Sequence, residues 1–129
     1  MAYDIKNLSL GTLVASSSYA LKQYRGVTAS TVEGKFSIGA TTGQIFPLGI
    51  LQNNPLTGEA GEIWIPGCIS KIVAGSAISV GDRFHIAANG LAYSTASVAA
   101  GSALYGPVLE TGASSGVITV SFTPFGITT

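Results

Sequence analysis

The side chains that could do chemistry are few and scattered. The chain has one histidine, His85, and one cysteine, Cys68. Its acidic residues include Glu59, Glu62 and Asp82. A zinc site needs three or four ligands drawn from Cys, His, Asp and Glu. No HxH or CxxC spacing accompanies the single histidine and cysteine, so we expect no bound metal and no cofactor.

Nucleophilic catalysis is not predicted either. His85, Asp82 and a serine would make a triad on paper, but no Gly-x-Ser-x-Gly turn presents a nucleophile. Cys68 with His85 as its base is an alternative pair, yet a small buried role suits Cys68 better. Glu59 and Glu62 are expected to be solvated charges, because a glycosidase pair needs a defined separation in a cleft. No phosphate-binding glycine motif occurs. We therefore expect no catalytic residues and no enzyme.

Composition excludes further classes of protein. Only 9% of the 129 residues are charged, against roughly 25% in an average soluble domain. Apolar residues make up 47% and the formal net charge is zero, which excludes intrinsic disorder. The few cations are scattered rather than clustered, so we expect no nucleic-acid partner. No apolar run reaches the roughly 20 residues of a membrane span, so we expect no membrane partner.

A surface with so few charges repels its neighbours weakly. We interpret it as a surface that lies against other protein, with an unusually uncharged monomer as the alternative. The single cysteine allows no internal disulfide, which fits synthesis in a reducing cytosol. The competing interpretation of the first twenty residues is a secretory signal. Asp4 cancels Lys6 there and five polar residues interrupt the apolar run, so we do not expect one.

The remaining sequence predicts an all-β fold, a small barrel or sandwich, because short β-branched runs alternate with glycine turns. Strands are expected at 24–28, 31–38, 45–52, 62–66, 69–74, 83–87, 91–95, 104–110 and 117–122. Asn89–Gly90 predicts a two-residue hairpin turn. That turn would place Ile86 opposite Tyr93 and Phe84 opposite Thr95, with Phe84, Ile86, Leu91 and Tyr93 on one face. Residues 97–104 are the only candidate for a helix. Pro124 and Gly126 are expected to end the last strand, 117–122.

Residues 1–20 are predicted to form an extended N-terminal arm, and residues 21–129 a single β-rich domain. The arm's apolar residues and the only tryptophan are the candidates for an interface: Leu8, Leu10, Leu13, Val14 and Trp64. Ile63 and Ile65 suit the core, which leaves Trp64 on the opposite face of its strand. There it either packs under a loop or anchors an interface, since tryptophan is enriched in binding hot spots.

Several segments together resemble one known family. Pro47-Leu48-Gly49-Ile50-Leu51-Gln52-Asn53-Asn54-Pro55, followed by Gly58-Glu59-Ala60, resembles the "GVLQN-P-GE" signature of tailed-phage capsid cement (head-decoration) proteins. The segments that follow the same family's order are 20–25, Gly67 with 71–75, Ile78, 81–82, 88–90, 106–110 and 117–120. The similarity covers about residues 20 to 122. The chain departs from the family in its longer, more apolar arm and in Trp64, where a smaller residue is usual.

The resemblance implies a structural protein on the outer surface of the virion capsid, with a fold of the β-tulip type. Its partner would be the major capsid protein, and a homotrimer would bridge neighbouring coat subunits. The family has no catalytic residues to transfer. The alternative is a receptor-facing or carbohydrate-binding β-domain of a virion fibre or surface appendage. A sugar-binding platform would require Trp64, Tyr93 and Tyr105 to share a face.

Overall fold

A computed structural model describes residues 9–10, 13–39, 47–95 and 102–127. The class predicted from sequence is confirmed: the molecule is all-β, and its curled sheets form a half-barrel. The strands are β1 (Ser9–Leu10), β2 (Val14–Ala15), β3 (Gly26–Ala29), β4 (Lys35–Ile38), β5 (Gly49–Leu51), β6 (Ile63–Trp64), β7 (Ile69–Val73), β8 (Phe84–Ile86), β9 (Ala92–Ser94), β10 (Ala103–Tyr105), β11 (Val117–Ser121) and β12 (Pro124–Ile127).

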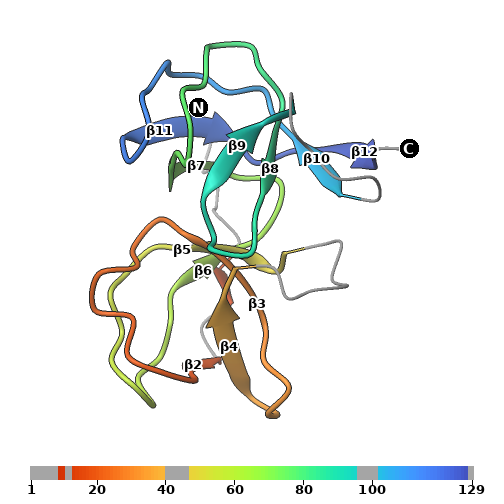
Figure 1. Ribbon diagram of the computed structural model, residues 1–129. Coiled ribbons are helices and arrows are strands. Elements are labelled where there is room, and N and C mark those ends of the chain that lie inside the picture. Colours follow the sequence, from red (N-terminus) through yellow and green to blue (C-terminus); the bar gives the residue numbers. More distant parts are fainter. Residues whose placement is uncertain (1–8, 11–12, 40–46, 96–101, 128–129) are drawn as a thin grey trace, which may run out of the picture.

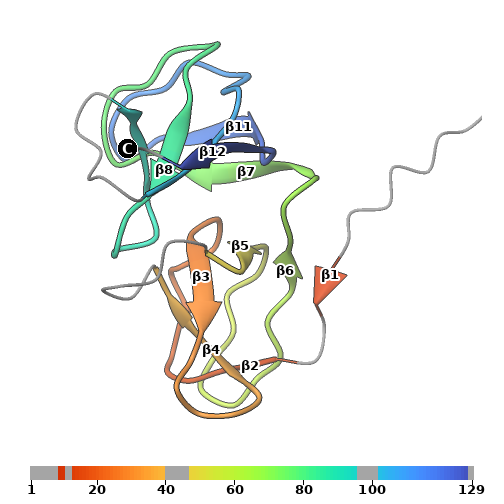
Figure 2. The same cartoon turned by 90° about the vertical axis from the view of Figure 1, so that its right-hand side faces the viewer.

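The strands divide into two lobes, one above the other in Figure 1. The lower lobe is a six-stranded sheet in the order β1-β6-β5-β3-β4-β2. The upper lobe contains a four-stranded sheet, β12-β10-β8-β9, and the β7–β11 ribbon. The chain crosses between the lobes where β6 continues into β7 (Figure 2). The described residues contain no helix long and apolar enough to cross a membrane.

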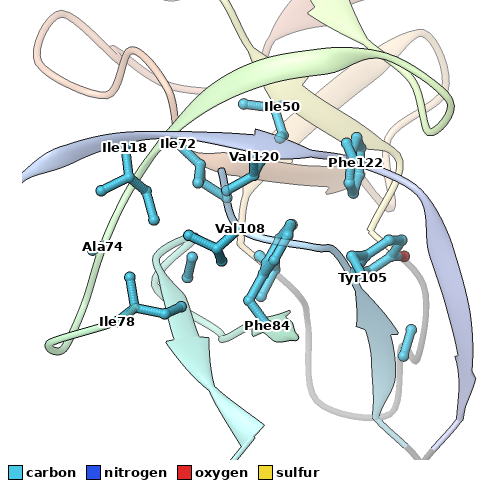
Figure 3. Close-up of a cluster of buried hydrophobic side chains, with 13 residues drawn as sticks. Ile50, Ile72, Ala74, Ile78, Phe84, Tyr105, Val108, Ile118, Val120 and Phe122 are labelled. Carbon is cyan, nitrogen blue, oxygen red and sulfur yellow. The ribbon is translucent and has the colours of Figure 1, made fainter. Parts of the chain in front are cut away.

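Each lobe encloses its own apolar core. The upper core is the larger, and its side chains converge from the ribbon and the four-stranded sheet (Figure 3). Its three aromatic rings are in contact: Tyr105 lies 5.8 Å from Phe84 and 4.6 Å from Phe122, measured between ring centroids. The lower core consists of Ala15, Val27, Phe36, Leu51 and Ile63. Burying these side chains supplies most of the free energy of folding.

The alternation predicted for the last long strand is confirmed in β11. Ile118 and Val120 point into the upper core, and Phe122 continues the same face. Val117 lies on the opposite, exposed face. The partner strand β7 alternates in the same way and pairs with β11 in antiparallel register, with Lys71 opposite Thr119. The outer face of this ribbon is therefore exposed or half-buried, while its inner face is buried.

The two lobes are joined by backbone hydrogen bonds and by one buried side chain. Gly26 N donates a 2.8 Å hydrogen bond to Gly90 O, which joins β3 to the tip of the β8–β9 hairpin. Val73 N donates to Tyr24 O at 2.9 Å, which joins β7 to the segment before β3. Ile50 extends from the lower sheet into the upper core. The lobes are thus bonded into one unit.

The hairpin at Asn89–Gly90 exists, but the predicted register was wrong by one residue. His85 lies opposite Tyr93 and Ile86 opposite Ala92, so the loop has three residues rather than two. Gly90 ends the loop with a φ of 79°, and its N–H bonds to Ala87 O at 2.9 Å. The choice between two-residue and three-residue loops lies in this backbone geometry, which Asn-Gly alone does not determine. Tyr93 therefore leaves the face that Phe84 and Ile86 share.

Two further expectations need correction at the chain's C-terminal end. Residues 103–104 of the predicted helix lie in strand β10, and residues 97–101 lie outside the described residues. Strand β11 ends at Ser121, before Pro124 as expected, but Pro124–Ile127 then forms a further strand, β12, at the edge beside β10 with a register shift at Leu104/Tyr105. Proline is tolerated at the start of an edge strand because its missing N–H costs no ladder bond there.

Part of the predicted arm is paired within the lower lobe. β2 pairs with β4 in parallel, and Ala15 is fully buried in the lower core. β1 adds to the sheet edge beside β6, with Ser9 opposite Trp64. Residues 1–8 and 11–12 lie outside the described residues. The division into an arm and a single domain stays a prediction. A deletion of the chain through residue 19 would remove strand β2, which contributes to the lower core.

Candidate binding groove

The described surface is hollowed beside the β6–β7 crossing. The groove has a volume of about 300 Å³ and is lined by Tyr24, Gln52, Trp64, Ile69, Ser70, Lys71 and Thr119. Its walls come from both lobes, because Trp64 lies on β6 while Lys71 and Thr119 lie on the β7–β11 ribbon. This volume lies at the lower end of the range for ligand pockets, roughly 300–1,000 Å³.

Strand alternation places the groove's upper wall. Ile69 and Lys71 are on the outer face of β7, where Ile69 keeps half its surface exposed. The intervening Ser70 is buried, and its hydroxyl accepts a 2.9 Å hydrogen bond from Gln52 Nε2. Gln52 Nε2 also donates to Ile50 O at 3.1 Å. These bonds fix the Gln52 amide at the floor, where the two lobes join.

Tyr24 enters the groove from a backbone conformation that costs free energy. Its φ is +65°, the left-handed region, which a bulky residue rarely adopts. Tyr24 N donates to Leu51 O at 2.7 Å and Tyr24 O accepts from Val73 N at 2.9 Å, so both sides of the residue are held. Such a conformation costs about 1–3 kcal/mol and persists only where the surroundings enforce it.

Trp64 lies half-buried on the opposite face from the fully buried Ile63, as its strand pattern predicted. Its indole N–H points to Glu62 Oε1 at 3.4 Å, a long hydrogen bond that orients the ring. Ile65, which was expected in the core, is only half-buried. Trp64 is the one predicted interface residue that lines the groove.

The other predicted interface residues are not gathered with Trp64. Leu13 is half-buried against the lower core, and Val14 is half-buried in β2. Leu10 lies on β1 opposite Ile63, and Leu8 lies outside the described residues. Their role in contacting a partner stays a prediction. Sequence reasoning missed Tyr24, Lys71 and Thr119, because only the pairing of β7 with β11 beside β6 brings them to Trp64.

The aromatic platform of the alternative interpretation does not form. Tyr105 is 1% exposed and belongs to the upper core. Tyr93 stacks on His85 with ring centroids 5.9 Å apart, on β8–β9. Neither lines the groove with Trp64.

The titratable residues considered for catalysis are held in separate local contacts. Asp82 Oδ2 accepts from Ser79 N at 3.0 Å, and Glu59 Oε1 accepts from Leu56 N at 2.8 Å. Cys68 is buried. Across the described ranges, no three His, Cys, Asp or Glu side chains are placed to hold a metal ion.

His85 is the one titratable side chain with an unpartnered buried atom of its own. Its Nδ1 has no hydrogen-bond partner among the described residues. Burial lowers the pKa of His85 from its ordinary value of 6.5, and a backbone hydrogen bond with Tyr93 partly opposes this. The uncharged imidazole is therefore the form that the fold favours.

This pKa predicts a pH-dependent stability. As the pH falls below 6.5, the unfolded chain takes up the His85 proton before the folded chain does. The free energy of unfolding should therefore fall from that pH until the lower pKa of the folded state is reached. Urea unfolding from neutral pH to about pH 5 should show a drop in wild type that His85→Gln lacks. Parallel curves for the two proteins would contradict this assignment.

Comparison with known proteins finds a solved structure with a similar fold. No protein-family model matches the sequence, and no curated protein matches it. A solved structure does match: the crystal structure of the head fiber gp8.5 N base in bacteriophage phi29, with a TM-score of 0.67 at 20% sequence identity. The alignment covers 92% of this chain and 98% of that one. The two chains share a fold.

Proposed function

We propose that this chain is a structural protein of a phage virion, which binds the outer surface of the assembled head and cements neighbouring major capsid protein subunits. The observation that carries the proposal is the fold shared with the phi29 head fiber base, which spans nearly the whole of both chains. The quoted sequence segments that resemble cement proteins support the same class. A charge-poor surface suits a protein that remains bound to other proteins.

Two exposed leucines suggest where the lower lobe contacts the shell. Leu21 is 89% exposed and Leu56 is 52% exposed. Their loops are bonded to each other: Tyr19 N donates to Pro55 O at 2.8 Å, and Gln23 N donates to Asn54 Oδ1 at 3.0 Å. We call these two side chains the Leu21–Leu56 patch. Apolar groups held out on a bonded pair of loops are available to a partner at little ordering cost.

A homotrimer, as the cement family implies, would present three such patches to the shell. Linked sites raise the effective concentration of the second and third contacts, so modest single contacts become firm attachment. Binding only to the assembled shell stabilises that shell by mass action.

The test is co-sedimentation of the purified chain with matured, expanded heads of the phage that encodes it, prepared without this protein. We expect saturable binding at a fixed number of copies per head. Leu21→Asp should weaken it by about tenfold or more, because a carboxylate would be desolvated in an apolar contact. Val80→Asp is the matched control on the upper lobe, where Val80 is 60% exposed, and should bind as wild type does.

Wild-type protein that stays in the supernatant would overturn the cementing proposal. Equal binding by Leu21→Asp and wild type would remove the Leu21–Leu56 patch while leaving the function in place. Circular dichroism of both variants checks the fold, which is expected to be unchanged because each substituted side chain is exposed.

The second candidate is the base of a head fibre that faces a receptor, favoured by the fold shared with the head fiber base of phi29. The copy number separates the two. A cement protein occupies sites all over the shell, whereas a fibre base occupies only the positions from which fibres project.

A further inference from the structure

The groove beside the β6–β7 crossing combines two kinds of surface that rarely meet on a charge-poor protein. Trp64, Tyr24 and Ile69 supply aromatic and apolar walls. Gln52, Lys71 and Thr119 supply an amide, an ammonium group and a hydroxyl to the lining of the same groove. A ligand pocket typically pairs an apolar lining with a few placed polar groups of this sort.

We propose that this groove binds a saccharide unit, with one sugar ring stacked on Trp64. A pyranose ring has an apolar face of C–H groups and an edge of hydroxyls. The C–H face suits the electron-rich face of an indole. The hydroxyl edge suits hydrogen-bonding side chains, and Gln52, Lys71 and Thr119 line the same groove. The inference goes beyond the capsid contact, because it concerns a different surface and a different class of partner.

The polar groups of the groove retain free hydrogen-bonding capacity. Gln52 uses its Nε2 for Ile50 O and Ser70 Oγ, and no described residue bonds to its Oε1. In the same described ranges, no acidic side chain forms an ion pair with the exposed Lys71 ammonium. Thr119 is already held by Glu110 Oε2, at 2.9 Å from its hydroxyl, which fixes that side chain in place. An acceptor and three donatable N–H groups thus remain for sugar hydroxyls.

The strained Tyr24 is the second observation in favour of a binding site. Residues held at sparsely populated φ values cluster at ligand-binding and active sites. They persist only where the surrounding structure enforces the strained conformation. Backbone bonds to both lobes hold Tyr24 beside the groove. A preformed wall lowers the entropy lost on binding.

The single tryptophan gives a direct readout, since all indole fluorescence comes from Trp64. The purified chain is titrated in separate experiments with N-acetylglucosamine, galactose and glucuronate. We expect at least one of them to change the emission saturably. Lys71→Ala should weaken that response by about tenfold. Lys35→Ala, on β4 and outside the groove, is the matched control and should respond as wild type does.

Three outcomes would overturn the saccharide site: no saturable response to any of the three sugars, equal responses from Lys71→Ala and Lys35→Ala, or self-association that Lys71→Ala abolishes while the sugars have no effect. The last would assign the groove to a second copy of the chain. None of them bears on head binding, which the sedimentation assay measures with no sugar present.

Discussion

Gly39→Ala is expected to lower the free energy of unfolding by about 2–5 kcal/mol, the sum of a strained backbone and an overpacked contact. Gly39 has a φ of +85°, a value that residues with a side chain rarely adopt. A Cβ there would lie 1.8 Å from Ala88 O, at the tip of the β8–β9 hairpin. Since that carbonyl is backbone, the hairpin of the upper lobe would have to move off the lower sheet. Urea unfolding monitored by circular dichroism measures the change.

Gly58→Ala is the matched control for the junction. Gly58 has a similar φ of +80°, but a Cβ there meets nothing within 4 Å. It should therefore cost only the backbone strain, about 1–2 kcal/mol. Equal losses in the two variants would mean that the hairpin does not press on Gly39, and would contradict the close packing of the lobes.

Phe122→Ala is expected to be the most damaging core truncation, with a loss of about 3–5 kcal/mol. Phe122 has no exposed surface, and its ring lies 4.6 Å from that of Tyr105 in the upper core (Figure 3). Truncation would leave a cavity between the β7–β11 ribbon and the four-stranded sheet, and neither could shift far enough to fill it. A domain of this size typically has only about 5–15 kcal/mol of stability in total, so the protein should unfold at much lower urea.

Phe125→Ala removes the same side chain from an exposed position three residues further on. Phe125 is 49% exposed, and Arg83 lies over its ring at 4.6 Å. The loss should stay within about 1 kcal/mol, because an exposed cation–π contact contributes little. A loss as large as that of Phe122→Ala would contradict the placement of the core.

The periodicity of the sequence was sufficient for the strands that line a core. In β11, the alternation of Ile118 and Val120 with polar neighbours was read directly as one buried face, and the structure confirms it. Short strands were not predictable in the same way. β12 begins at a proline and pairs only because β10 offers it an edge. That pairing is a long-range contact, which no local propensity encodes.

The groove illustrates the same limit. The outward position of Trp64 followed from its neighbours in the sequence. Tyr24, Lys71 and Thr119 reach it only through the antiparallel register of β7 with β11 and the bond between Tyr24 and Val73. The close approach of Gly39 to Ala88 also joins segments far apart in sequence, so no local pattern around Gly39 indicates it. Sequence spacing could identify candidate residues for a site, but only the topology of the folded chain brings those residues together.

We propose above that this chain lies on the outside of a phage head and bridges its coat subunits. An electron cryo-microscopy map of the intact virion tests this role most directly. We expect density for this fold on the outer surface, repeated over the shell, with Leu21 and Leu56 against the major capsid protein. Density confined to the base of projecting fibres, or a shell that lacks this fold altogether, would contradict it.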